Sequence, residues 1–492
     1  MTELTAANGI RAHGRLLAVR LLALATTLLL SACNLGPHYV RPDIPAPTAW
    51  TPVTPESTPS EPAPADNPAW PDALWWHAFG SPQLDRLINL AQQANDDLKA
   101  AVARVQQSDA QVRISGAPLF PAVNAGFTPA RQRMFLPNGS SPTLTFNSFT
   151  AELTATYELD FWGRNAALRA AAVAQATGSR YDRETVQLSM LASVATTYFT
   201  VLSLRDRVQV ATTNLANARE TLRGLQLEQQ VGTATGLDVA QQQSLVDTED
   251  ATLPALRAQL SHTLAALAIL LGTTPDQLHL DDTTLDQIGA PAVSTGLPAG
   301  LLARRPDVAS AEAQLVAANA NVRAARAAFL PTIALTASGG AESTALSTLL
   351  LPGSRIFDLS AGLTQPIFQG GAIAGAYAQS KGRYQELLAD YHKAVISAFG
   401  NTQDALTQVH ETSEQLLRQQ RATQTARRAY EFSQQQFHAG TINILTVLTT
   451  ETALLTAQDT QAQVRLANLT ALVSLYQALG GGWDTQQEQT LQ

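Results

Sequence analysis

The chain has 492 residues, of which 45% are hydrophobic and 15% are charged. This hydrophobic content argues against a disordered chain, and beyond the N-terminus no apolar run is long enough to predict a membrane helix. The formal net charge is −8, and because residues 1–32 contribute +2, the rest of the chain carries −10. There is no basic patch, so we expect no nucleic-acid partner.

The N-terminus predicts an export signal over residues 1–32. Arg11, Arg15 and Arg20 precede a short apolar run, which ends in Leu-Ser-Ala-Cys at Cys33, the only cysteine of the chain. This ending resembles the bacterial lipobox, which implies cleavage before Cys33 and a covalent lipid on that residue. The alternative is a plain secretory signal followed by a stray thiol. Apart from the lipid, we expect no cofactor and no metal.

Residues 33–73 predict an extended tether, because the stretch 42–71 is rich in Pro, Thr, Ser and Glu. Trp75 and Trp76 then begin the folded body. Apolar spacing predicts one helix over residues 84–115, a strand over 122–128 and a loop over 134–147.

Residues 149–159 alternate between apolar and polar side chains without a break. This period of two predicts a strand with one apolar face and one face toward water. The polar positions, which we expect to face an aqueous lumen, are Thr150, Glu152, Thr154, Thr156 and Glu158.

After residue 163 the apolar period changes to seven. Val194, Val201, Val208, Leu215 and Leu222 share one heptad position, which predicts a helix with a coiled-coil seam. A helix over residues 164–230 is roughly 100 Å long. A second helix returns antiparallel to about residue 272, with a bend expected at Pro254.

The same unit of helix, two strands, long helix and returning helix then occurs again. A shift of 208 residues carries Phe149 onto Phe357, Gly232 onto Gly440 and Gly272 onto Gly480. We therefore divide the body into repeat 1 (74–272, with a β-hairpin at 122–161), a connector (273–299), repeat 2 (300–483, with a β-hairpin at 332–368) and a flexible tail (484–492).

The four strands expected in each chain cannot close a barrel with a lumen, and open strand edges are not tolerated in lipid. Three copies supply twelve strands, enough for a transmembrane barrel. A soluble β-sandwich is the alternative, and it leaves the long helices without partners.

The chain resembles the outer-membrane efflux factor family, of the TolC/OprM type and its NodT subfamily, over nearly its whole mature length. The motifs that carry the resemblance are residues 36–42 (GPHYVRP), 157–163 (YELDFWG), 301–308 (LLARRPDV), 365–371 (QPIFQGG) and 479–483 (LGGGW). The family implies a mixed α/β membrane protein: a trimeric, twelve-stranded β-barrel in the outer membrane, continued by a long α-helical barrel in the periplasm.

The resemblance also implies function and partners. We expect a passive exit channel of a tripartite multidrug efflux system, opened by a periplasmic adaptor protein and fed by an RND-type inner-membrane transporter. Two alternatives remain open: an outer-membrane duct for type I polypeptide secretion, and a non-channel coiled-coil structural lipoprotein of the periplasm. No catalytic grouping is evident, so we do not expect an enzyme.

Two turns match the family's helical-hairpin tips, where the adaptor docks by resemblance. They are Val231-Gly232-Thr233 and Ala439-Gly440-Thr441.

The gate residues at this tip depart from the family. Relatives often carry acidic residues just beyond the second turn, where this chain has Thr446 and Thr449, and Asp238 is the only acid nearby. We therefore predict a gate held more by the packing of Leu445 and Leu448 than by an anionic ring.

The motif around residues 304–307 contains Arg304, Arg305 and Asp307. We expect these charges to position a helix terminus.

Overall fold

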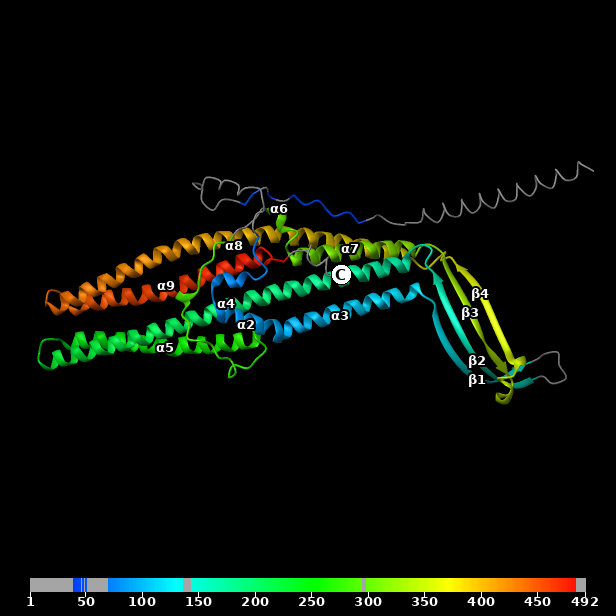
Figure 1. The fold of residues 1–492 in the computed structure, drawn as a ribbon, viewed down its shortest axis with the longest axis horizontal. Coiled ribbons are helices and arrows are strands. Elements are labelled where there is room, and N and C mark those ends of the chain that lie inside the picture. The colour runs from blue at the N-terminus through cyan, green and yellow to red at the C-terminus, as the bar shows by residue number, and fades with distance from the viewer. Residues whose placement is uncertain are drawn as a thin grey trace, which may run out of the picture. The chain divides into compact units, whose positions relative to one another are not determined.

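The computed structural model describes residues 39–45, 47, 49–50, 70–135, 143–293 and 298–483 (Figure 1). The expected signal (1–32), the anchor Cys33, most of the tether and the tail (484–492) lie outside the described residues. The chain divides into two compact units. One contains residues 106–178 and 312–390, and the other contains residues 43–105, 179–311 and 391–492.

The first unit holds one antiparallel four-stranded sheet, in the order of the chain (Figure 1). Its strands are β1 (Ala122–Phe135), β2 (Thr143–Leu159), β3 (Thr332–Ser343) and β4 (Arg355–Thr364).

The loop expected over residues 134–147 is wrong at both ends. Met134 pairs with Leu144, and Phe135 pairs with Thr143. Pairing satisfies the backbone N–H and C=O groups of these residues, so β1 and β2 run on well beyond the expected strand ends.

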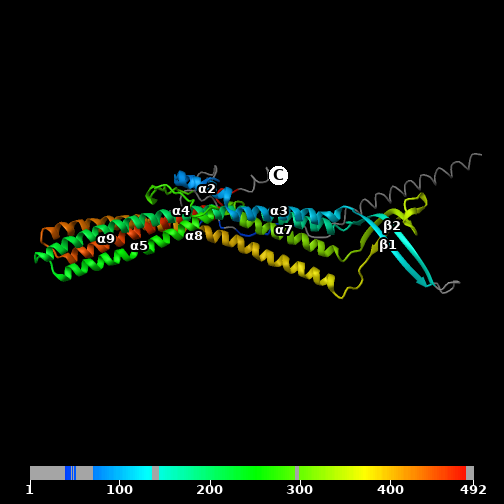
Figure 2. The ribbon, with the colours of Figure 1, turned by 90° about the horizontal axis from the view of Figure 1, so that it is seen from below.

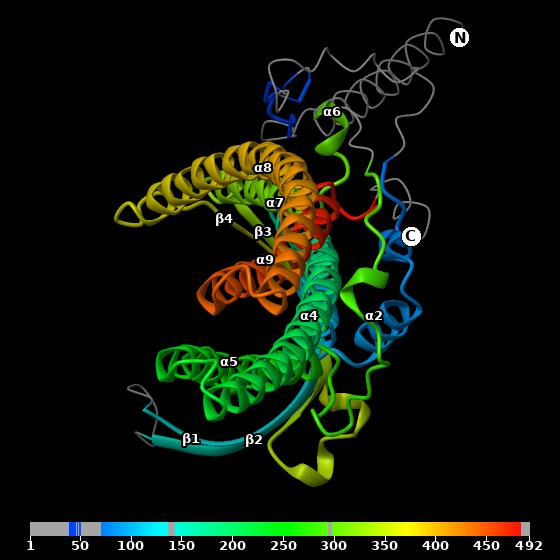
Figure 3. The ribbon, with the colours of Figure 1, turned by 90° about the vertical axis from the view of Figure 1, so that its left-hand side faces the viewer.

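Long helices dominate the second unit and extend into the first. They are α3 (Asp96–Gly116), α4 (Arg164–Gln230), α5 (Gly236–Leu270), α7 (Pro306–Ala327), α8 (Ala372–His438) and α9 (Ile444–Ala478). In the second unit α4 with α5 and α8 with α9 form two antiparallel hairpins (Figure 2), and Figure 3 views both hairpins from their tips. The short helices are α2 (Pro82–Ala94), α6 (Pro298–Leu301) and the 3-10 turns at Trp75–Phe79, Ala117–Leu119, Leu285–Gln287, Leu346–Thr348 and Pro352–Ser354.

The internal duplication is visible in the helix boundaries. The shift of 208 residues that aligns the sequences carries both ends of α4 onto both ends of α8, and both ends of α5 onto both ends of α9. Each long helix has 67 residues and each returning helix has 35. The two hairpins are therefore copies of one unit.

One helix was expected over residues 84–115, but the structure has two, separated at Asn95. Asn95 has an extended backbone (ψ 127°), and its side chain accepts a hydrogen bond from Leu98 N (2.9 Å) and donates one to the Leu270 carbonyl (2.8 Å). Asn competes for local backbone groups in this way, so it ends α2 and caps α3.

Aromatic side chains fill the core of the second unit. Trp75 stacks on Tyr476 with ring centroids 5.0 Å apart, and Phe79 packs against Phe199. Tyr198 is fully buried and donates a hydrogen bond to Gln83 (3.0 Å). This cluster holds α2, α4, α5 and α9 together at the base of the hairpins.

Two helices are more apolar than we expected. Parts of α4 and α5 are long and apolar enough, by length and composition alone, to cross a membrane. In α4 half of that stretch is buried inside the chain. Pro254 lies within α5, which continues through it to Leu270.

Candidate functional site

The sheet of the first unit has two chemically different faces around its middle, because the register there places polar side chains opposite polar ones and apolar residues opposite apolar ones. Thr154 lies opposite Asn124 and Ser338, and Ser338 lies opposite Asp358. On the other face Leu153 lies opposite Ala125 and Gly339, and Gly339 lies opposite Phe357. The expected lumen positions Thr150, Glu152, Thr154, Thr156 and Glu158 all share the polar face, since side chains alternate along a strand.

The apolar face is left open within the single chain. Large hydrophobic side chains stand exposed along it, with 87% of Phe357 and 79% of Leu359 accessible. Only the inner edges of the sheet are paired, so β1 and β4 each keep one free edge among the described strands. A sheet with an exposed apolar face and two free edges requires lipid on that face and further strands at its edges.

The hairpin tips have nearly identical backbone turns. Gly232 and Gly440 have φ values of 83° and 70°, and the residue after each donates its N–H to a carbonyl five residues earlier. This left-handed glycine ending is the Schellman motif, which favours glycine because a Cβ is strained in that conformation. Thr233 and Thr441 repeat the bond through their hydroxyl groups, each at 3.0 Å. The turns at 231–233 and 439–441 thus lie exposed at equivalent places, where the sequence put the adaptor-docking residues.

Asp238 has a structural role in addition to the gate role expected from the sequence. Its carboxylate accepts hydrogen bonds from the N–H (2.8 Å) and hydroxyl (2.7 Å) of Thr235, which in turn caps the start of α5. In repeat 2, Asn443 and Thr446 occupy the same positions, and Asn443 Oδ1 accepts from Thr446 N at 3.2 Å. Asp238 and Thr446 are therefore equivalent capping positions, and Thr449 bonds the Leu445 carbonyl of its own helix.

We expect two different substitutions of Asp238 to separate its two roles. Asp238→Ala removes the Asp238 half of the capping box and destabilises the first hairpin by about 1 kcal/mol. Asp238→Asn removes the charge but keeps an acceptor, so it leaves thermal stability close to wild type. If Asp238 also forms an anionic ring, Asp238→Asn lowers the cation selectivity of single channels, and Thr446→Ala does not. Unchanged selectivity in both variants contradicts the ring.

The two hairpins meet near their tips in a small hydrophobic cluster. Leu225 of α4 packs against Ile444, Val447 and Leu448 of α9, with Val239 of α5 at the border. Leu448 is only 8% exposed, whereas Leu445 is 52% exposed in the single chain. Leu448 is thus part of this contact, and Leu445 is outside it. We name this cluster the tip joint.

A second contact ties the hairpins together farther from the tips. The guanidinium of Arg207 on α4 makes a two-pronged ion pair with Asp459 on α9, with distances of 2.6 and 3.3 Å. Such forked geometry is stronger than a single charged hydrogen bond. Neighbouring Arg219 and Asp250 pair within the first hairpin, at 3.0 Å.

A buried carboxyl group lies between these two contacts. Glu451 is 3% exposed, and burial, the charge of Glu249 and a hydrogen bond with Tyr430 together set its pKa at about 7. Burial and the charge of Asp459 raise the pKa of Glu249. Burial also raises the pKa of Tyr430 to about 12, with the charge of Glu451 as the second cause.

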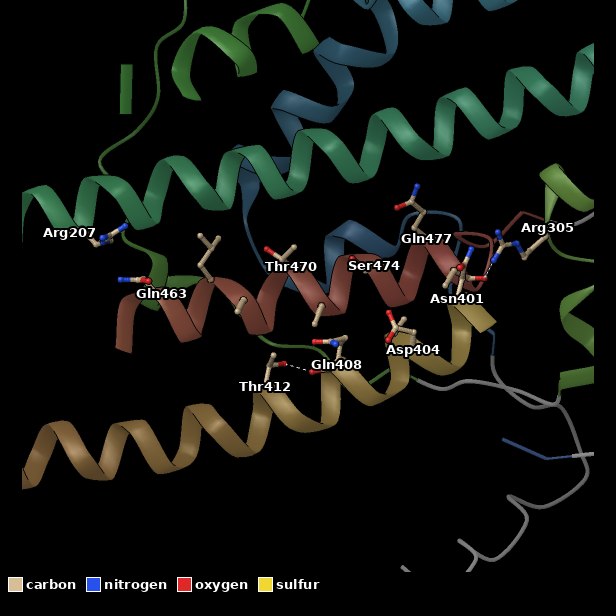
Figure 4. A pocket seen from close by; sticks show the side chains of 15 residues that line it. Arg207, Arg305, Asn401, Asp404, Gln408, Thr412, Gln463, Thr470, Ser474 and Gln477 are labelled. Carbon is tan, nitrogen blue, oxygen red and sulfur yellow. Dashed lines mark hydrogen bonds between the residues drawn. The ribbon is translucent and has the colours of Figure 1, made fainter. Parts of the chain in front are cut away.

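A groove of about 820 Å³, lined by both polar and apolar side chains, follows α8 and α9 in the second unit. Figure 4 shows Arg207 at one end and Arg305 at the other, with amide and hydroxyl side chains between them. These groups hold no charge cluster suited to one ligand.

The motif at residues 304–307 positions helix ends, as expected. Arg305 pairs with Asp307 at the start of α7 (2.6 Å) and donates to the carbonyl of Ala478, the last residue of α9 (3.1 Å). Arg304 lies over the ring of Trp70. A buried cation at the C-terminal carbonyl of α9 also suits the helix dipole.

Comparison with known proteins agrees with this geometry. The sequence profile of the outer membrane efflux protein family matches residues 87–273 and again residues 297–481. The pyoverdine export outer membrane protein OpmQ of Pseudomonas aeruginosa is 39% identical, over 94% of this chain and 97% of its own. The toluene efflux pump outer membrane protein TtgF of Pseudomonas putida is 34% identical, over 96% and 98%. The outer-membrane channel OprN superposes with a TM-score of 0.84 at 26% identity, over 92% of this chain and 100% of its own.

The chain belongs to the outer membrane efflux protein family. It is an outer-membrane efflux channel, with the trimeric β-barrel and periplasmic helical barrel of that fold class. The two matches of the family profile fall on the two repeats. The two-faced sheet is then one chain's part of the barrel wall.

Sequence reasoning missed Glu451 entirely. A signal was present, because Glu451 lies three residues after Leu448 and three before Leu454, both of them buried. On a helix that spacing places the carboxyl group on the packed face.

Proposed function

We propose that three copies of the chain form the passive exit duct of a tripartite pump. A periplasmic adaptor binds the tip turns, and an RND-type transporter of the inner membrane supplies both cargo and energy. The duct itself does no chemistry. The pair of exposed, equivalent tip turns carries the proposal, because three chains with two such turns each offer a nearly sixfold surface to the adaptor.

Opening follows from how the tips are held. The tip joint and the Arg207–Asp459 pair are two contacts that fix one hairpin on the other beyond the aromatic core at their base. An adaptor that binds the turns at 231–233 and 439–441 more tightly when the hairpins are apart shifts the channel toward its open state. Leu448 must leave the tip joint when the hairpins separate. Leu445, Thr446 and Thr449 lie beside Leu448 in the first turns of α9.

Cys33 anchors each chain by a covalent lipid in the outer membrane. The lipobox spacing before Cys33 supports this assignment. Acyl chains contribute about 0.8 kcal/mol per buried CH₂ group, so a multiply acylated terminus is held firmly.

Small molecules are the cargo. The relatives are named for pyoverdine export and toluene efflux, two unlike small compounds. The polar sheet face and the low charge of the chain suit a water-filled duct without one recognised ligand.

Deletion of the chain from its host tests the cargo. We expect the deletion strain to become hypersensitive to several unrelated compounds and to accumulate a fluorescent efflux substrate, both reversed by the wild-type gene. Cys33→Ser measures the anchor separately from the barrel. Loss of one secreted polypeptide, with drug susceptibility unchanged, contradicts small-molecule export and favours a secretion duct.

A further inference from the structure

Glu451 is buried without full hydrogen bonding. It lies on α9 one turn beyond Leu448, and its side chain is 3% exposed. Its Oε2 atom has no hydrogen-bond partner among the described residues. An ionised carboxylate in this position lacks both water and a cation, which is costly.

The groups that face Glu451 come from both hairpins. Tyr430 of α8 forms a hydrogen bond with the Glu451 carboxyl group. The charge of Glu249 on α5, in the other hairpin, raises the pKa of Glu451. The charge of Asp459 raises the pKa of Glu249, and Asp459 is itself paired with Arg207.

Other charged side chains on α5 and α8 are exposed or paired. Asp250 of α5 pairs with Arg219 of α4, and Asp247 of α5 is exposed. On α8 the side chains of Arg427, Arg428 and Glu431 are exposed. Among the described residues, no cation forms an ion pair with Glu249 or Glu451, and no positive charge lowers the pKa of either carboxyl group.

We propose that Glu249 and Glu451 form a proton-sensitive contact between the two hairpins of the gate. With a proton on Glu451 the hairpins stay packed. When Glu451 ionises opposite Glu249, desolvation and repulsion favour their separation. This inference rests on the proposed gating at the tip joint.

How opening depends on pH follows from the pKa of Glu451 in the packed form. Burial first, and Glu249 second, raise the pKa of Glu451 from 4.5 to about 7, against the weaker opposite effect of Tyr430. In separated hairpins water reaches the group, and its pKa returns toward the ordinary value. The proton thus stabilises the packed form fully below about pH 4.5, and this stabilisation is lost as the pH rises to 7. The equilibrium constant for opening rises on the order of 100-fold over this pH range and stays constant at higher pH.

Single-channel recording of the full-length trimer in planar bilayers measures this directly. We expect open probability to rise between pH 5 and 7 and to level off by pH 8. In Glu451→Gln the rise disappears. In Glu249→Gln the plateau comes at lower pH, because a charge that raises the pKa is gone. In Tyr430→Phe it comes at higher pH, because a hydrogen bond that lowers the pKa is gone. Glu431→Gln, an exposed carboxylate on α8, is the matched control and keeps the wild-type profile.

A distance measurement separates this contact from the gate as a whole. Leu227 on α4 and Phe432 on α8 are both exposed. Spin labels at Leu227→Cys and Phe432→Cys report the distance between the hairpins by double electron–electron resonance spectroscopy. We expect a longer distance at pH 8 than at pH 5, and no change in the Glu451→Gln background. A wild-type distance and open probability that are both flat from pH 5 to 8, or a rise that survives in Glu451→Gln, overturn the proton-sensitive contact. A pH-dependent distance without any conductance supports the contact and contradicts the proposed function.

Discussion

Leu359→Arg is expected to prevent the channel from assembling in the outer membrane, whereas Ser360→Arg on the next residue of β4 is expected to be tolerated. Leu359 lies in the middle of the strand, on the apolar face of the sheet, and is 79% exposed in the single chain. An arginine facing lipid near the bilayer midplane costs about 2–4 kcal/mol. Each trimer carries the substitution three times, so the total cost of about 6–12 kcal/mol is comparable with the whole stability of a typical domain.

Ser360 is the matched control because it points to the opposite face. It lies opposite Thr336, which lies opposite Thr156 on the polar face. The measurement is the amount of heat-modifiable trimer in outer-membrane fractions, for both variants expressed at equal levels. Equal loss of trimer in both, or loss in Ser360→Arg alone, contradicts the assignment of the faces.

Gly480→Ala is expected to destabilise the folded chain by several kcal/mol. Gly480 follows the end of α9 with φ +87°, and a Cβ there would lie 1.8 Å from the carbonyl oxygen of Arg304. The left-handed backbone alone costs about 1–3 kcal/mol for a residue with a side chain. The steric overlap adds to this cost, because the Cβ atom and the Arg304 carbonyl oxygen are both fixed by the backbone and neither can rotate away. The same segment places Arg305 against the end of α9.

Gly224→Ala is the control for this prediction. Gly224 lies within α4, and a Cβ there meets nothing within 4 Å. Alanine in a helix interior is favoured over glycine by about 1 kcal/mol, so this variant is expected to be as stable as wild type or more so. Thermal unfolding of the purified trimer, followed by circular dichroism, measures both. A Gly480→Ala protein that melts at the wild-type temperature contradicts the close backbone approach.

The repeat and the long helices could be predicted from the sequence because they depend on periodicity. The polar positions 150–158 and the shift of 208 residues needed only side-chain alternation and self-similarity. Helix ends were predicted well where glycine marks them, at Gly232 and Gly440.

The features that could not be predicted from the sequence depend on tertiary contacts. The break at Asn95 depends on the Leu270 carbonyl, which is distant in sequence. The longer strands β1 and β2 depend on the ladder between them, since Met134 and Thr145 show no strong alternation on their own. The burial of Glu451 depends on how the two hairpins pack, and a single helix cannot reveal it. The role of Asp238 as a cap was readable from Thr235 three residues earlier, but the family pattern directed attention to the pore.

Conductance of the purified, membrane-extracted protein in planar bilayers, with its subunit number measured on the same sample, tests the central claim most directly. We predict three chains per particle and discrete channels that open rarely at acidic pH. Weakening the tip joint by Leu448→Ala is expected to raise the open probability without changing the subunit number. A stable monomer, or a trimer that never conducts even with Leu448→Ala, would contradict a channel gated at the hairpin tips.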